Sequence, residues 1–214
     1  RIELARVAER DPARAAALGI VSAQIAPDPL ALARDPSLKI VVELMGGTGI
    51  ARDFIDLAIR EGKGVVTANK ALLAEAAESL VGLATRGRTP LCFEASVAGG
   101  IPILKALREG LVANRIISIH GIVNGTCNFI LSSMTQTGQP YAEALAEAQR
   151  LGYAEADPTL DVGGHDAMHK ACILASLAYG FWTRPSEVHT RGIDGIAPEE
   201  LHFAKVLGYT IKHL

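Results

Sequence analysis

Residues 40–68 read IVVELMGGTGIARDFIDLAIREGKGVVTA, and the first half of the chain is best interpreted from this stretch. It opens with an apolar run at 40–44 and closes with another at 65–68, both rich in β-branched residues. The segment between them, 51–60, has apolar residues at helical spacing and ends shortly before a glycine. Strand, helix and strand at this spacing form the crossover unit of a parallel sheet.

The same alternation extends in both directions from this stretch. Downstream, residues 71–84 are rich in Ala, Leu and Glu and predict a second helix, and the run LCF at 91–93 predicts a third strand. Upstream, residues 2–7 read IELARV and predict a strand, so the chain is expected to start in mid-fold. We therefore expect an α/β fold in which right-handed helical crossovers join the strands of a parallel sheet.

The pattern changes after Phe93. A glycine-rich loop at 96–100 precedes a short predicted helix, and residues 116–123 (IISIHGIV) have strand character. Further helical segments are predicted near 128–135, 140–151, 165–179 and 198–207. A last strand is predicted near residue 210. We place a domain boundary near residue 94, which gives two domains, 1–93 and 94–214.

Composition and charge exclude several classes of protein. Of 214 residues, 49% are hydrophobic and 21% are charged, which is typical of a soluble globular protein and not of a disordered chain. The net charge of -2 offers no basic excess for a nucleic-acid partner. The longest apolar stretch, 171–182, is too short for a membrane span, and we expect neither a membrane anchor nor a signal peptide. Three widely spaced cysteines indicate a reducing, cytoplasmic location.

Several residues lie where predicted strands end, which is where ligands bind in an open parallel sheet. Lys70 begins a helix, where a cation opposes the helix dipole; it either extends into solvent or meets an anion or polar reacting group. Gly46 and Gly47 lack the G-x-G-x-x-G spacing of a dinucleotide-binding turn, and either line a cofactor or form a plain tight turn. Arg10 follows the strand at 2–7, where it would bind a ribose 2′-phosphate or lie in a solvated turn.

The densest group of charged residues lies between positions 152 and 170. Its loop lacks the ligand spacing of a calcium-binding hand, and we predict that Asp157 and Asp161 cap the next helix, whereas the pattern assigns no role to Glu155. Asp166 and Lys170 are four residues apart on an otherwise apolar helix, so they can pair. If buried, such a pair would orient an ammonium group for proton transfer.

Two further patterns suggest metal ions. His165 and His169 are also four residues apart, a spacing that can bind zinc on one helix face. A zinc hydrolase would need a third ligand, and none is obvious downstream. Glu94 begins a glycine-rich loop whose carbonyl oxygens, with the carboxylate, could hold a cation. Taken alone, this loop is better interpreted as a structural turn.

Five runs in this order resemble homoserine dehydrogenase. They are TANK at 67–70, EASVAGGIP at 94–102, GIVNGTCN at 121–128, LGYAEADP at 151–158 and DVGGHDAMHK at 161–170. The resemblance covers essentially the whole chain. It implies an incomplete Rossmann-type NAD(P)-binding sheet, followed by an α+β catalytic and dimerisation domain with a mixed sheet covered by helices. Neither the family's glycine-rich first turn nor its C-terminal end is present, so the chain resembles a fragment of the enzyme.

The resemblance implies an oxidoreductase of threonine and methionine biosynthesis, which reduces L-aspartate 4-semialdehyde to L-homoserine with NADPH or NADH. In that role Lys170 would donate the proton to the aldehyde oxygen and accept it in reverse. Asp166 would hold the substrate and the ammonium of Lys170. Glu155 would bind the substrate amino group, and Lys70 would lie beside the nicotinamide and the substrate.

The same resemblance implies further binding residues and a homodimer. Arg10 and Gly152 would contact the cofactor, and we expect Gly46 and Gly47 to line it. A monovalent cation, Na⁺ or K⁺, would be held by Glu94 and by the backbone of Val97, Gly99 and Ile101. The alternative to a dehydrogenase, apart from the zinc hydrolase, is a non-catalytic remnant of the same family that retains only dimerisation or regulation.

Overall fold

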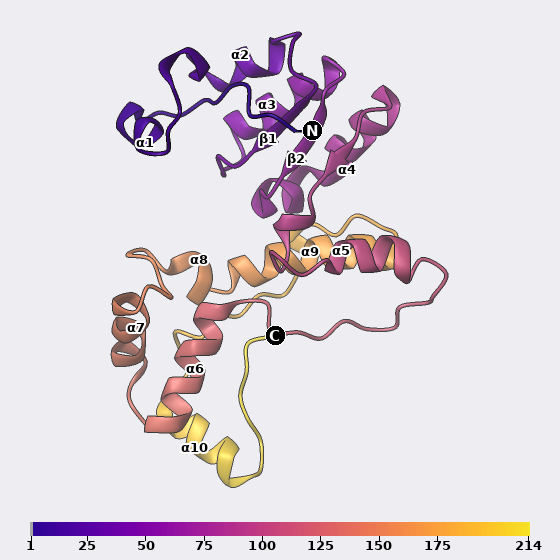
Figure 1. Cartoon of the computed structure of the whole chain (residues 1–214). Helices are drawn as coiled ribbons and strands as arrows, with labels where there is room; N and C mark the ends of the chain where they lie inside the picture. The colour runs from indigo at the N-terminus through magenta and orange to yellow at the C-terminus, as the bar shows by residue number, and fades with distance from the viewer. Residues whose placement is uncertain (1) are drawn as a thin grey trace. The chain divides into compact units, whose positions relative to one another are not determined.

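The computed structural model describes residues 2–214 and divides the chain into two compact units (Figure 1). The first unit is Arg1–Ile101 and the second is Pro102–Leu214. The loop that follows Phe93 therefore belongs, by its contacts, to the first unit. Among the described residues, the helices are all too short or too polar to cross a membrane.

The first unit contains a three-stranded parallel sheet, as the sequence predicts. Its strands are β1 (Ile40–Glu43), β2 (Gly64–Thr67) and β3 (Leu91–Cys92), in that spatial order. Val65 of β2 pairs with Val41 on one side and with Leu91 on the other. The crossovers are α3 (Ile50–Arg60) and α4 (Lys70–Gly87). This is the predicted incomplete Rossmann-type arrangement.

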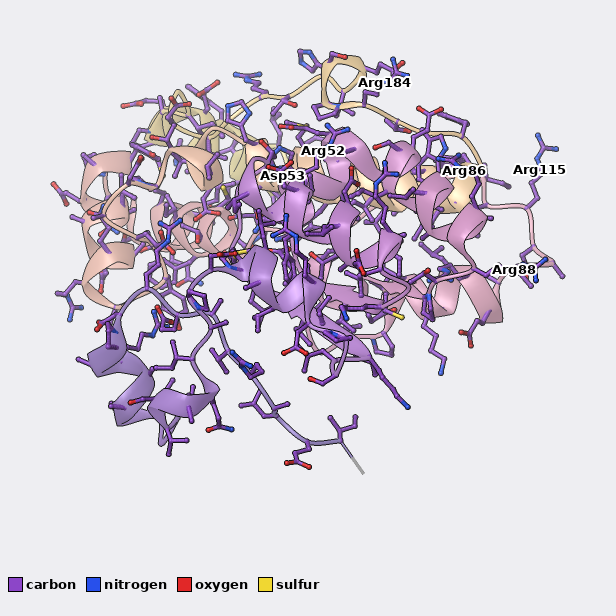
Figure 2. The ribbon with its side chains drawn as sticks, turned by 90° about the horizontal axis from the view of Figure 1, so that it is seen from above. Arg52, Asp53, Arg86, Arg88, Arg115 and Arg184 are labelled. Carbon is purple, nitrogen blue, oxygen red and sulfur yellow. The ribbon has the colours of Figure 1, made fainter. Side chains whose placement is uncertain are left out.

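The core of this unit lies on one face of the sheet. Val41 and Val65 are 5% and 1% exposed and pack with α3 and α4, whereas Val42 and Val66 on the opposite face are exposed. Both α3 and α4 are amphipathic, and their apolar faces contribute to this core. Ile55 of α3 is fully buried. Figure 2 labels exposed residues of these two helices. Arg52 and Asp53 belong to α3, and Arg86 and Arg88 lie at the end of α4.

The segment before β1 differs from the prediction. Residues 2–7 do not form a strand; Val7 alone makes a parallel bridge, with Ile25. A strand needs a neighbour along its length to satisfy its backbone groups, and this segment has one at a single position. The elements that follow are α1 (Pro12–Ala17), η1 (Ser22–Gln24) and α2 (Pro29–Arg34). Asp11 and Asp28 cap the two α-helices, each followed by a proline at the first helical position.

The second unit is helical. Its elements are α5 (Ile103–Lys105), the π-helical turn η3 (Ala106–Gly110), α6 (Gly125–Thr137), α7 (Tyr141–Arg150), α8 (Thr159–Val162), α9 (His165–Tyr179), η4 (Pro185–Glu187) and α10 (Pro198–Val206). Ile130, Leu131 and Met134 of α6 are at most 1% exposed and form the centre of a core with α7, α8 and α10. Gly138 and Gly180 end α6 and α9 in the left-handed conformation, the usual helix stop.

The mixed sheet predicted for the second half does not form, because the described residues 102–214 contain no strand. Figure 1 shows residues 111–123 as a long loop between η3 and α6. Ile117 is 88% exposed, and Ile119 and Ile122 are also exposed. Strand character alone cannot make a sheet, since every strand needs a neighbour to pair with. The strand predicted near residue 210 is likewise irregular.

Candidate active site

In the second unit, the predicted pair of Asp166 and Lys170 forms. The Lys170 ammonium lies 2.7 Å from Asp166 Oδ2 and donates a second hydrogen bond, of 2.6 Å, to the carbonyl oxygen of Val123. Asp166 is buried and Lys170 is largely covered, because this face of α9 packs inside the unit. Gly164, at φ 84°, turns the chain directly into α9. The ammonium is thus oriented by a carboxylate and a carbonyl group in a largely buried position.

A side chain that the pattern did not single out, Asn124, joins this pair to Asp161. Its amide nitrogen donates to Asp161 Oδ1 at 2.7 Å and to Asp166 Oδ2 at 2.8 Å. Its amide oxygen accepts the Cys127 amide at 2.8 Å, so Asn124 is also the N-cap of α6. An asparagine directly before a helix is a recognisable capping signal, but nothing in the sequence points to the carboxylates it meets.

The two aspartates predicted to cap the next helix have different roles. Asp157 accepts hydrogen bonds from the amide and the hydroxyl of Thr159 at the start of α8, and the helix that it was predicted to cap, α9, begins after Gly164 without a side-chain cap. These hydrogen bonds also hold the pKa of Asp157 below its usual value. Asp161 lies within α8, so the prediction was wrong for it. Its carboxylate instead accepts hydrogen bonds from Asn124 and from the Thr126 hydroxyl.

Cys127 borders this cluster as a buried thiol. Its thiol donates to the carbonyl oxygen of Asp161. Burial, together with the charges of Asp161 and Asp166, raises the pKa of the Cys127 thiol to about 12. A thiol that stays protonated at neutral pH has neither the charge nor the exposure of a reactive cysteine.

Two residues of α6 contact the loop that carries Gly152 and Glu155. The Tyr153 ring stacks on Phe129, with ring centroids 4.6 Å apart, and the Tyr153 carbonyl accepts the Thr126 hydroxyl at 2.6 Å. Gly152 has φ 79° at the end of α7. Glu155 is exposed on this loop.

The described residues do not provide a set of ligands for the zinc site of the alternative interpretation. His165 is exposed on the first turn of α9, and His169 lies one turn further along. Within residues 2–214, no group of three His, Cys, Asp or Glu side chains is placed to hold a metal ion. Two histidines on one helix turn do not by themselves complete a tetrahedral zinc site.

In the first unit, a buried carboxylate organises the carboxyl ends of β1 and β2. Glu43 is 1% exposed; one of its oxygens accepts the amides of Met45 and Gly46, at 2.7 and 3.0 Å. Its other oxygen accepts the Thr67 hydroxyl at 2.6 Å. A buried carboxyl group with three hydrogen-bond donors is well compensated. Glu43 therefore fixes the start of the glycine loop relative to the end of β2.

Asn69 completes this arrangement next to Lys70. Its amide nitrogen donates to the carbonyl oxygen of Gly47 at 2.7 Å, and its amide oxygen caps α4. Gly46 and Gly47 have φ 74° and 72°, which only glycine adopts at low cost. No atom lies within 4 Å of the position that a Cβ would take at either glycine, so both face open space. Lys70 is half-buried at the first position of α4.

Two predicted sites remain in this unit, and one of them, Glu94, follows β3 at the same carboxyl edge of the parallel sheet. Arg10 is exposed on the turn before α1. Glu94 begins the short helix η2 (Glu94–Ser96), and the chain then turns tightly, with the Ile101 amide donating to the Ala98 carbonyl. Val97 is buried there, whereas Gly99 and Ile101 are exposed. Ala98 has φ 50°, an unusual conformation for alanine.

Comparison with known proteins matches each half of the chain to a family model. Residues 102–214 match the family model for homoserine dehydrogenase, and residues 1–94 match the model for the NAD-binding domain of homoserine dehydrogenase. The homoserine dehydrogenase of Neisseria gonorrhoeae is 51% identical over 193 residues, which are 90% of this chain and 44% of that protein. That of Pseudomonas aeruginosa is 47% identical over 213 residues, 100% of this chain and 49% of that protein.

Solved structures support the same assignment. The homoserine dehydrogenase of Thiobacillus denitrificans superposes with a TM-score of 0.93 at 47% identity, over 97% of this chain and 48% of that one. A hyperthermophilic archaeal homoserine dehydrogenase in complex with NADPH gives a TM-score of 0.73 at 34% identity, over 79% of this chain and 52% of that one. The chain spans about half the length of the relatives it matches. It belongs to the homoserine dehydrogenase family, with the NAD-binding domain of that family in its first half.

Proposed function

We propose that this chain carries substrate and cofactor residues of an NAD(P)H-dependent oxidoreductase that interconverts L-aspartate 4-semialdehyde and L-homoserine. The observation that carries the proposal is the buried pair of Asp166 and Lys170, in a chain that belongs to the homoserine dehydrogenase family. A carbonyl reduction needs a proton donor at the oxygen, and an oriented ammonium is suited to that task.

Lys170 would be the proton donor. An ammonium has three N–H groups, and Lys170 directs two of them to Asp166 and to the Val123 carbonyl. The third would donate to the substrate oxygen and stabilise the negative charge that develops there. In the reverse direction the neutral amine would accept the hydroxyl proton of homoserine. When bound, the nicotinamide cofactor supplies the hydride.

The first unit offers a surface that fits part of a nucleotide cofactor. Gly46 and Gly47 face open space at the carboxyl end of β1, in a loop that Glu43 and Asn69 hold in place. We propose that these glycines and Lys70 contact the cofactor, in line with ligand binding at the strand ends of such sheets. A structural relative bound to NADPH and the exposed position of Arg10 support NADPH as the cofactor.

The remaining roles follow from the resemblance. Gly152 would contact the cofactor, and Glu155, which is exposed on the loop after α7, would bind the substrate amino group. We also propose a homodimer. The exposed isoleucines of residues 116–123 support it, because extended apolar segments of this kind are usually covered by a partner.

The proposed function is tested with a chimera in which this chain replaces the matching segment of the Pseudomonas aeruginosa homoserine dehydrogenase. We expect turnover of L-homoserine with NADP⁺, measured by the absorbance of the reduced nicotinamide. The unmodified Pseudomonas protein is the control. A folded chimera that binds NADPH but shows no turnover would favour the non-catalytic alternative.

A monovalent cation at Glu94 gives a separate prediction. The unusual φ of Ala98 and the tight turn up to Ile101 support a loop shaped for a ligand. If Na⁺ or K⁺ binds there, either salt should raise the melting temperature of the chimera more than tetramethylammonium chloride does. A cation at 100 times its dissociation constant would add about 2.7 kcal/mol of stability.

Glu94→Ala should remove this difference between the salts. Glu61→Ala, which removes an exposed carboxylate at the end of α3, is the matched control and should leave the difference intact. Identical melting temperatures in all three salts before any substitution would show that the loop is a turn without a bound cation.

A further inference from the structure

The Asn124 side chain donates hydrogen bonds to both Asp161 and Asp166. It is 3% exposed and its amide nitrogen carries two hydrogens, one for each carboxylate. Its amide oxygen is engaged by the Cys127 amide. The opposite amide orientation would place that oxygen against two carboxylates, so the observed orientation is fixed by the surroundings.

Asn124 and Lys170 share an acceptor. Both donate to the same oxygen of Asp166, Oδ2, from 2.8 and 2.7 Å. Hydrogen bonds to a buried, charged oxygen are strong and directional. The amide therefore holds the Asp166 carboxylate in the rotamer that meets the ammonium of Lys170.

The backbone at Asn124 adds a second constraint. As the N-cap of α6, Asn124 has extended dihedral angles of φ -121° and ψ 115°, and its cap hydrogen bond fixes the chain at that point. The preceding carbonyl, that of Val123, is the other acceptor of the Lys170 ammonium. Both acceptors of the ammonium are thus positioned by one residue, through its side chain for Asp166 and through its backbone for Val123.

We propose that Asn124 is a positioning residue for proton transfer by Lys170. It keeps Asp166 and the Val123 carbonyl where they hold the ammonium, and it ties Asp161 of α8 to the same arrangement. The inference rests on the proposed function, in which Lys170 is the proton donor. It differs from a purely structural role, in which Asn124 would serve only to cap α6.

Serine and aspartate separate the two roles. Both cap helices about as well as asparagine, so Asn124→Ser and Asn124→Asp retain an acceptor for the Cys127 amide. Neither retains an amide donor for Asp161 and Asp166. In the chimera we expect both variants to lower kcat by about 10- to 100-fold, by analogy with the loss seen when the hydrogen-bond partners of metal-binding residues are removed. The KM for the cofactor should stay unchanged.

Asp28→Ser is the matched control for exchanging a cap. Asp28 caps α2 by one hydrogen bond to the Ala31 amide and lies outside the proposed site. This variant should retain wild-type kcat. If kcat in both Asn124 variants falls only because a smaller fraction of the protein is folded, as the melting curves would show, the role of Asn124 is structural and the proposal is overturned.

A readout independent of turnover uses the 214-residue chain itself. Acetic anhydride modifies free amines, and the modification of each lysine can be measured by peptide mass spectrometry. The held ammonium of Lys170 should react more slowly than the exposed Lys205. In Asn124→Ser the ratio of Lys170 to Lys205 modification should rise, while in Asp28→Ser it should not.

The two failures can be told apart. An inactive chimera with Asn124 intact would contradict the proposed function, and the modification ratio would still report whether Asn124 holds the ammonium. An active chimera in which Asn124→Ser changes neither kcat nor the modification ratio would overturn the positioning role.

Discussion

Replacing Lys170 with alanine in the chimera should lower kcat by about 10²- to 10⁴-fold, the usual contribution of a general acid or base. The KM for the substrate should change less, because the proton is transferred in the transition state and not on binding. Steady-state kinetics in both directions measures the effect. Circular dichroism should accompany them, because the substitution leaves the buried Asp166 without its cation.

Lys170→Arg is the control for that lost ion pair. A guanidinium keeps a positive charge near Asp166 but does not release its proton at accessible pH, so this variant should fold well and still turn over slowly. Near-normal kcat in both Lys170 variants would contradict the mechanism.

The pH profile separates the two lysines. If Lys170 is the proton donor, the fall in the rate of aldehyde reduction at high pH should disappear with Lys170→Ala, because it would reflect loss of the donated proton. Lys70→Ala should retain that fall and should alter the KM for the cofactor as well as kcat, since Lys70 begins α4 at the strand-end edge. If the fall at high pH is lost with Lys70→Ala instead, the roles assigned to the two lysines are reversed.

The sequence predicts the parallel sheet well because that signal is local. Apolar β-branched runs at 40–44 and 65–68, separated by an amphipathic helix, require each other as neighbours. The runs at 2–7 and 116–123 have similar composition, yet one forms a single bridge and the other no strand. A strand is a property of a pair of segments, and composition reports on one segment at a time.

The same distinction applies to the site. The pair of Asp166 and Lys170 could be predicted because four residues on a helix fix the distance between two side chains. Asn124 meets Asp161 and Asp166 across 37 and 42 residues of chain, and no periodicity encodes such a contact. The role of Glu43 could not be predicted from the sequence, for a related reason. The residue lies in the run predicted as a strand, but its donors come from the following loop and the next strand.

Gly192 should be among the least replaceable residues of the second unit. A Cβ at Gly192 would overlap the Val162 carbonyl oxygen and would lie 2.9 Å from Gly163 Cα. Both atoms belong to backbone at the junction of α8 and α9, where the Ile193 amide also donates to the Val162 carbonyl. The backbone cannot move aside as a flexible side chain would. Gly192→Ala should therefore destabilise the unit by about 1–3 kcal/mol or more, the cost of overpacking.

Thermal unfolding of the 214-residue chain measures this, since 1 kcal/mol shifts Tm by about 2–4 °C at this size. Gly195→Ala is the matched control. It lies three residues further along the same loop, and a Cβ there would meet nothing within 4 Å, so its Tm should stay near that of the wild type. Because the junction carries Asp161 on one side and leads to Asp166 on the other, Gly192→Ala should also increase the modification of Lys170 relative to Lys205. Equal Tm values for the two glycine variants would mean that residues 162–163 can yield to a methyl group, and that the junction does not hold the cluster in place.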